Sequence, residues 1–154
     1  MKKHASTLIV VVALAPLFAN PVAASDRDDV MATVKQYDDA FNKSDMKAWN
    51  ALCTDKAIII DDFAPHVWQG ANACGDWWNA LDAEMKKSGI SNGAVTLGQA
   101  WQVTVTGDRG YAVYPTHFTY RLKGKPASER GVWTLALQKL APGWRITGWG
   151  WAQR

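Results

Sequence analysis

Two adjacent carboxylates, Asp61 and Asp62, follow directly after the apolar run Ile58-Ile59-Ile60. A β-branched run of this kind predicts a strand, in which successive side chains point to opposite faces. One carboxylate is therefore expected to face the interior, where burial would raise its pKa and make it a useful general base. We take Asp61 as that candidate catalytic residue. The alternative is that both acids lie outside, at a solvated strand end or as a helix cap.

Tyr37 is the second candidate catalytic residue. It belongs to an apolar stripe of Val30, Val34, Tyr37 and Phe41, whose spacing predicts one face of a helix. A tyrosine on such a stripe is usually part of the core, but a buried phenol still needs a hydrogen-bond partner. Either Asp61 or a ligand in a cavity could supply that partner.

The aromatic residues indicate a binding pocket. The chain has 9 tryptophans, more than a small core needs, and aromatic side chains are typical of pockets for small apolar or ring-shaped ligands. The candidate lining residues are Trp68, Trp77, Trp78, Tyr114, Phe118, Tyr120 and Trp133. The alternative is that these rings fill the interior completely and leave no pocket.

Residues 1–24 have the three parts of a secretory signal peptide. Lys2 and Lys3 form a short basic start, residues 8–18 are an apolar stretch, and Val22 and Ala24 are the small residues before a cleavage site. The apolar stretch is too short to span a hydrocarbon layer of about 30 Å. We therefore expect cleavage after Ala24 and a periplasmic or secreted protein, with no membrane segment after cleavage.

The composition of the chain favours one folded domain over residues 25–154. Of 154 residues, 48% are apolar and 20% are charged, a balance that argues against disorder. The 17 basic residues exceed the 14 acidic ones mainly through Lys2 and Lys3 of the predicted signal peptide. Without a basic cluster in the remainder, we expect no nucleic-acid partner and no binding to anionic lipid.

Cys53 and Cys74 are the only cysteines. An even number in an oxidising compartment favours a disulfide, which would stabilise the fold by about 3 kcal/mol on the chain-entropy model. Two buried free thiols are the alternative. The cysteines lack zinc-ligand spacing, and neither His66 nor His117 has a recognised spacing to an acidic ligand. We therefore expect no metal site and no cofactor.

Hydrophobic periodicity predicts helices first and a sheet afterwards. The period changes from 3.6 to 2 near residue 94, and turns at 106–110, 123–126 and 141–143 separate long antiparallel strands. The predicted order is a helix from residue 26, a short helix at 46–52, a strand at 57–62, a loop at 63–70, a helix at 77–88 and four strands over 94–152. This order is typical of an α+β fold, a curled antiparallel sheet closed by three N-terminal helices around a cone-shaped interior.

Several segments, taken in their order and spacing, resemble the nuclear transport factor 2-like superfamily, which includes the ketosteroid isomerases and the SnoaL-like proteins. They are VKQY and NKSD within 34–45, ALCTDKA at 51–57, WTLALQK at 133–139 and GWRI at 143–146. The resemblance covers the whole of residues 25–154. It implies a cone-shaped α+β barrel, dimerisation through the sheet and a pocket at the wide end of the cone, but no single function.

The ketosteroid isomerases offer a closer comparison. Tyr37 matches their oxyanion-hole tyrosine and Asp61 their general-base aspartate. Their second acid, kept protonated so that it can donate a hydrogen bond, would fall at Val132-Trp133-Thr134, where this chain has none. Three hypotheses follow: a binding domain for a small apolar molecule, an isomerase or dehydratase that uses Asp61 and Tyr37, or a dimeric protein-interaction module. The missing acid favours binding over catalysis.

The last predicted strand bears on the oligomeric state. Strict alternation places Trp144 and Ile146 in the core and Trp149 and Trp151 on the opposite, outer face. Two neighbouring exposed indoles would form an apolar patch that a homodimer could bury. The alternative is that the two sets are exchanged and the indoles line the pocket. On the first interpretation, we expect a homodimer.

Overall fold

The computed structural model describes residues 25–154, so the predicted signal peptide lies outside the described residues. The elements are α1 (Asp26–Asn42), α2 (Met46–Ala51), β1 (Cys53–Ile60), β2 (Val67–Gly70), α3 (Ala73–Ser88), β3 (Ile90–Leu97), β4 (Gln102–Thr106), β5 (Arg109–Leu122), β6 (Lys125–Leu140) and β7 (Gly143–Gln153). This is the α+β order that the periodicity predicts. Among the described helices, none is both long and apolar enough to cross a membrane.

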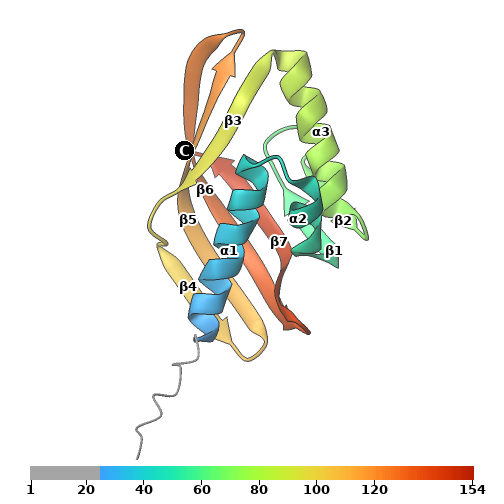
Figure 1. The fold of residues 1–154 in the computed structure, drawn as a ribbon, viewed down its shortest axis with the longest axis vertical. Helices are drawn as coiled ribbons and strands as arrows, with labels where there is room; N and C mark the ends of the chain where they lie inside the picture. The colour runs from blue at the N-terminus through green and yellow to red at the C-terminus, as the bar shows by residue number, and fades with distance from the viewer. Residues whose placement is uncertain (1–24) are drawn as a thin grey trace, which may run out of the picture.

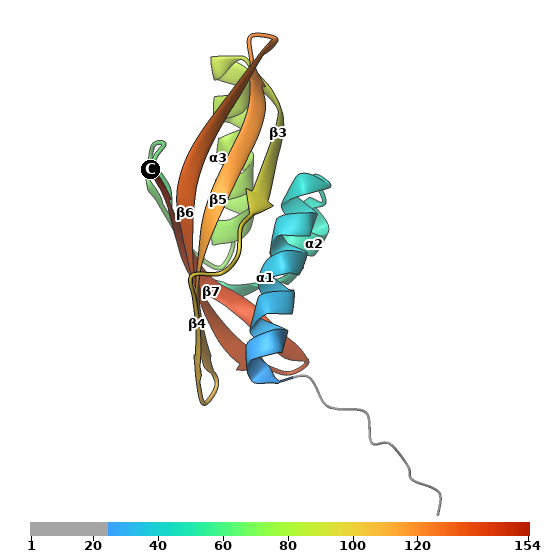
Figure 2. The same cartoon turned by 90° about the vertical axis from the view of Figure 1, so that its left-hand side faces the viewer.

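The seven strands form one curled, open sheet. Its order is β2-β1-β7-β6-β5-β3, and β4 also pairs with β5. All neighbours are antiparallel except β1 and β7, which run parallel. The three helices lie along one face of this sheet (Figures 1 and 2). The sheet and the helices together enclose the core, whose fully buried members include Val34, Ile59, Leu135 and Ile146.

Local sequence signals explain where the helices begin and end. Ser25 caps α1 in a reciprocal capping box with Asp28. The Asp45 side chain accepts a hydrogen bond from the backbone N–H of Ala48 at the start of α2. Helix α3 ends at Gly89, whose φ of 73° is a left-handed conformation that glycine adopts without a steric cost.

The number and the bounds of the strands differ in part from the predicted ones. Strand β1 begins at Cys53, before the isoleucine run, and the predicted loop at 63–70 contains the short strand β2. The predicted strand from residue 94 is two strands, because residues 98–101 interrupt it; β3 starts already at Ile90. These differences come from pairing with strands that are distant in the sequence, which local periodicity does not report.

A bulge in β7 corrects the prediction for Trp149 and Trp151. In the pairing of β6 with β7, Leu137 lies opposite Ile146 and Ala136 opposite Gly148, so Thr147 is an extra residue without a partner. The extra residue reverses the alternation. Trp149 is therefore buried on the same inner side as Ile146, and Trp151 lines the interior. The prediction that both indoles face outward is wrong.

The predicted disulfide between Cys53 and Cys74 is confirmed. It joins the start of β1 to the first turn of α3. This bond fixes α3 against the first residue of β1, the strand that leads to Asp61. The helix that carries Trp77 and the strand that precedes Asp61 are therefore held together covalently.

Candidate functional site

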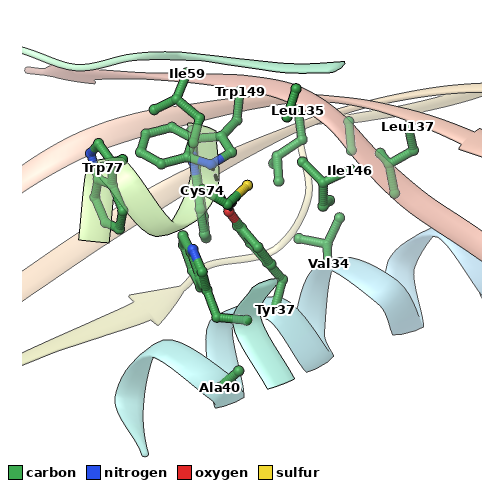
Figure 3. Close-up of a cluster of buried hydrophobic side chains, with 14 of the residues drawn as sticks. Val34, Tyr37, Ala40, Ile59, Cys74, Trp77, Leu135, Leu137, Ile146 and Trp149 are labelled. Atoms are coloured by element: carbon green, nitrogen blue, oxygen red, sulfur yellow. Dashed lines mark hydrogen bonds between the residues drawn. The ribbon is translucent and has the colours of Figure 1, made fainter. Parts of the chain in front are cut away.

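Tyr37 lies deep in the core and is fully buried. Its hydroxyl accepts a hydrogen bond from the indole N–H of Trp149 at 2.9 Å, and lies 3.4 Å from Cys53 Sγ and 3.5 Å from Cys74 Sγ. Figure 3 shows the hydroxyl directed at the sulfur of Cys74. Burial raises the pKa of Tyr37 well above its ordinary value. Its hydroxyl contacts protein atoms and is not among the groups that line the cavity described below.

An aromatic cluster surrounds Tyr37. Trp49 stacks on Tyr37, with ring centroids 3.5 Å apart, and on Trp77 at 5.2 Å. Trp149 crosses Trp77 at 85° and Trp133 at 84°, with centroid separations of 4.8 and 5.5 Å. The rings thus meet both in stacked pairs and edge to face, and edge-to-face contacts are among the arrangements that aromatic pairs prefer.

The cluster does not fill the interior. A cavity of about 110 Å³ remains between α1, α3, the end of β1 and the inner face of the sheet. Its lining residues are Phe41, Trp49, Asp61, Asp62, Phe63, Trp77, Leu81, Val95, Phe118, Glu129, Trp133, Trp149 and Trp151. An engineered apolar cavity of about 150 Å³ accommodates benzene. At about 110 Å³ the present cavity is somewhat smaller, so it has room for no more than one compact organic group.

Asp61 is the most buried acid at this cavity. Alternation along β1 places Ala57, Ile59 and Asp61 inside, while Asp62 is exposed. The Asp61 Oδ2 accepts a hydrogen bond from the indole N–H of Trp77 at 2.8 Å, and Oδ1 accepts one from the backbone N–H of Asp62 at 2.8 Å. Burial raises the pKa of Asp61 to about 6, although these two hydrogen bonds oppose the shift.

The loop after β1 holds the Asp61 backbone in place. The backbone N–H of Asp61 donates to the carbonyl of His66 at 3.0 Å, and the N–H of His66 donates to the carbonyl of Phe63 at 2.9 Å. His66 closes this loop with a φ of 72°, which is uncommon outside glycine. The loop turns Phe63 toward the cavity and packs it against Trp68, with centroids 4.9 Å apart and the rings tilted by 44°.

Glu129 is a cavity residue that the sequence analysis missed. It lies on β6 opposite Phe118 of β5, and it shares the inner face with Gly131 and Trp133. Its Oε1 accepts a hydrogen bond from the Tyr120 hydroxyl at 2.6 Å. Counting back along β6 from Trp133 in steps of two would have identified it. The superfamily comparison pointed instead to 132–134, which lies further along the strand.

Trp151 forms another part of the wall through a close fit to a glycine. A Cβ atom at Gly131 would lie 2.4 Å from the Trp151 ring, so only glycine leaves room for the indole there. The indole N–H of Trp151 donates to Thr116 Oγ1 at 3.0 Å. A residue without a side chain and a hydroxyl acceptor together fix the orientation of this ring.

The predicted pocket residues fall into two groups. Trp77, Phe118 and Trp133 line the cavity. Trp68, Trp78, Tyr114 and Tyr120 do not line it. Trp68 packs behind Phe63, and Trp78 lies edge-on to Phe41, 5.7 Å away between centroids. Tyr114 lies in a separate groove between α1 and β3. Tyr120 stacks on Phe118 and contributes indirectly, through its hydrogen bond to Glu129.

The arrangement can bind a small organic group and exchange a proton with it. A carboxylate has about four acceptor positions, so Asp61 can accept a further hydrogen bond besides those from Trp77 and Asp62. A pKa near 6 leaves most of its molecules ionised at neutral pH and able to take up a proton. Within residues 25–154, no group of three His, Cys, Asp or Glu side chains is placed to bind a metal ion.

The chain belongs to the SnoaL-like domain family, whose model matches residues 30–150. No curated protein matches it. Among solved structures, a nuclear transport factor 2-like protein with a cystatin-like fold from Novosphingobium aromaticivorans is similar, with 21% identity, a TM-score of 0.67 and coverage of 83% of this chain and 81% of that one.

Two further solved structures share the fold. A ketosteroid isomerase-like protein from Erwinia carotovora atroseptica has 18% identity and a TM-score of 0.67, over 83% of this chain and 95% of that one. A nuclear transport factor 2-like superfamily protein from Salmonella enterica serovar Typhimurium has 17% identity and a TM-score of 0.68, over 83% and 90%. At these identities the likeness shows the cone-shaped fold and no particular activity.

Proposed function

We propose that this protein binds a small, largely apolar molecule in the aromatic cavity, with Asp61 as its main polar contact. The observation that carries the proposal is the position of Asp61: a buried carboxylate in the wall of a cavity lined otherwise mainly by aromatic rings. Pockets that combine an apolar lining with few polar groups use those groups to orient the ligand. The ligand therefore carries a group that a carboxylate attracts, a hydrogen-bond donor or a positive charge, on the side that faces Asp61.

The binding test uses a compact neutral aromatic molecule, phenol, with tryptophan emission and the melting temperature as readouts. Binding to the folded state raises the melting temperature, and more so as the ligand concentration exceeds the Kd. The variant Leu81→Trp fills the cavity from α3 and should abolish both signals, since Leu81 lines the cavity and is only half-buried. The control Leu140→Trp makes the same change at an exposed site on β6 and should bind normally. If phenol and the two probes compared in the next subsection all failed to bind the unmodified protein, the proposal would be overturned.

Proton transfer is a second candidate function, in which Asp61 acts as the general base of an isomerase or dehydratase. The raised pKa of Asp61, about 6, favours this candidate because a base near the working pH is efficient. The hydroxyl of Tyr37 is held by Trp149, so this candidate rests on Asp61 rather than on a Tyr37–Asp61 pair. Asp61→Asn should abolish turnover, and Asp62→Asn should change it little.

Export to the periplasm or the medium is part of the proposal. The disulfide between Cys53 and Cys74 supports it, because such bonds persist mainly in oxidising compartments. Fractionation of cells that express the full chain tests it, with N-terminal sequencing of the recovered protein. We expect Ser25 at the new terminus, and an uncleaved chain in the cytoplasm would contradict export.

A further inference from the structure

All ionisable side chains that line the cavity have the same charge sign. Asp61, Asp62 and Glu129 line it, and among the residues described no lysine, arginine or histidine does. The nearby His66 directs its Nδ1 to the backbone carbonyl of Asp61, 3.2 Å away, and stays outside the lining. Because the whole chain has more basic than acidic residues, 17 against 14, this acidic lining does not follow from composition.

The other walls of the cavity are mostly aromatic. Eight of the lining residues are tryptophan or phenylalanine, contributed by α1, α2, α3, the loop after β1, and strands β5, β6 and β7. The crossing of Trp149 with Trp77 and Trp133 at nearly right angles makes walls in more than one direction. Ring faces attract cations within about 6 Å of the centroid, most strongly where water is excluded.

We propose that the ligand of this cavity is a small organic cation, a quaternary or tertiary ammonium group, held by the aromatic rings and paired with Asp61. This inference rests on the proposed binding function and adds the charge of the ligand to it. A quaternary ammonium has an apolar surface of methyl groups and a positive charge. It therefore matches both the aromatic lining and the acidic side chains, which a neutral ligand would not.

The placement of the three acids gives each a separate part in binding. Asp61 is buried, so an ion pair formed there is poorly screened by solvent. Asp62 is exposed and Glu129 half-buried, so these two lie on the solvent side of the cavity and attract a cation toward it. Tyr120 holds Glu129 in this position through its hydroxyl.

Binding of a cation should depend on pH in a defined direction. In the empty site, burial holds the pKa of Asp61 at about 6. A bound cation favours the ionised carboxylate and lowers this pKa, so affinity should fall as the pH drops below about 6. The other titratable groups that face the cavity, Asp62 and Glu129, are also acids, and their protonation weakens cation binding in the same direction.

The experiment compares choline with its neutral carbon isostere, in which a tert-butyl group replaces trimethylammonium. The two molecules have nearly the same shape and differ in charge. Titrations followed by tryptophan emission and calorimetry should give choline an affinity at least tenfold higher for the unmodified protein. Asp61→Asn should remove this preference and leave binding of the isostere unchanged.

Asp38→Asn is the matched control. Asp38 is another buried acid, on α1, with a pKa that burial also raises to about 6, but it does not line the aromatic cavity. The same chemical change there should preserve the preference for choline. Equal loss in both variants would show that the effect is general charge or altered folding, and would overturn the proposal.

The outcomes separate this inference from the proposed function. If the isostere or phenol binds and choline binds no better than the isostere, the ligand is not a cation, and the inference fails while the binding function stands. If choline, the isostere and phenol all fail to bind the unmodified protein, the binding function itself fails. A preference for choline that is lost only in Asp61→Asn supports both.

Discussion

The indole N–H of Trp77 donates a hydrogen bond to Asp61 Oδ2 at 2.8 Å, and both residues lie in the wall of the same cavity. The helix that carries Trp77 is joined to the strand that leads to Asp61 by the disulfide between Cys74 and Cys53. The orientation of the carboxylate thus depends on the packing of α3 against β1. A ligand that contacts Asp61 meets a side chain whose position is already fixed.

Trp77→Phe should raise the pKa of Asp61 above about 6, because the substitution removes a hydrogen bond that stabilises the ionised carboxylate. Phenylalanine keeps an aromatic ring against Trp49. Loss of a hydrogen bond to a charged group should also lower the free energy of unfolding by about 1.5–3 kcal/mol. A pH titration of the Asp61 carboxyl and urea denaturation measure the two effects. Trp78→Phe, whose ring lies outside the cavity, should leave the titration unchanged.

Asp61 and Asp38 should lower the free energy of unfolding as the pH rises, because burial raises the pKa of both carboxyls in the folded protein. Both carboxyls have pKa values raised from 3.8 to about 6 in the folded protein. The folded state therefore holds more protons than the unfolded chain between these values. This contribution to the free energy of unfolding falls as the pH increases from about 4 to 6 and is constant above that range.

The size of this pH effect can be measured with the two asparagine variants. Each carboxyl should lower the free energy of unfolding by up to about 3 kcal/mol at neutral pH, since one pKa unit corresponds to about 1.4 kcal/mol. Urea denaturation of Asp38→Asn at pH 7 and pH 4 should show a gain in stability over the unmodified protein that is larger at pH 7. A gain of equal size at both pH values would contradict the raised pKa of Asp38.

Gly131→Ala should displace the indole of Trp151, because the new Cβ would lie 2.4 Å from that ring. Overpacking of this kind costs about 1–3 kcal/mol, and the displaced ring should narrow or distort the cavity. We expect a lower melting temperature and weaker binding of phenol. Gly150→Ala is the control, since the nearest atom to its Cβ would be 3.9 Å away. Similar behaviour of the two alanine variants would contradict the tight fit.

Self-association is a further prediction, but its contact residues are not the two tryptophans of β7 that the sequence suggested. Trp149 and Trp151 face the interior, so they cannot form a dimer contact. The outer face of the sheet instead exposes Ile58, Ile60 and Val67, at 47%, 53% and 47%. Ile60 lies opposite Val67 on the neighbouring strand, so the exposed side chains are contiguous. An apolar patch of this kind is typical of a protein contact, and a homodimer would bury it.

Sedimentation or light scattering at micromolar concentration tests this prediction. We expect a dimer that Ile60→Glu dissociates without unfolding, because a charge at the centre of the patch opposes its burial. Leu122→Glu places the same charge at an exposed apolar residue outside the patch and should leave the mass of the dimer unchanged. A monomer in the unmodified protein would contradict the dimer.

The sequence predicted the fold because its signals are local. The capping box at Ser25, the helical stripe through Tyr37 and the period of two along the long strands each depend on neighbouring residues. Alternation after the isoleucine run predicted that one of the two acids faces inward, and in the structure that acid is Asp61. The resemblance to a known superfamily implied the same curled sheet as the order of elements, and the family match and the solved structures support it.

The composition of the cavity wall could not be predicted in the same way. One unpaired residue, Thr147, reverses the direction of Trp149 and Trp151 without changing the apolar pattern of β7. Glu129 reaches the cavity because β6 extends back to Lys125 and pairs with β5 along its length. Tyr37 is engaged by Trp149 and lies against both sulfurs of the disulfide, contacts made by residues far apart in the sequence.

The pKa of the Asp61 carboxyl, measured by carbon NMR in the free protein and again with bound ligand, tests the central claim most directly. We predict a value of about 6 in the free protein, assigned by its loss in Asp61→Asn, and a shift when choline or phenol occupies the cavity. An ordinary value near 3.8 that no bound molecule changes would show that Asp61 is solvated and separate from the binding site.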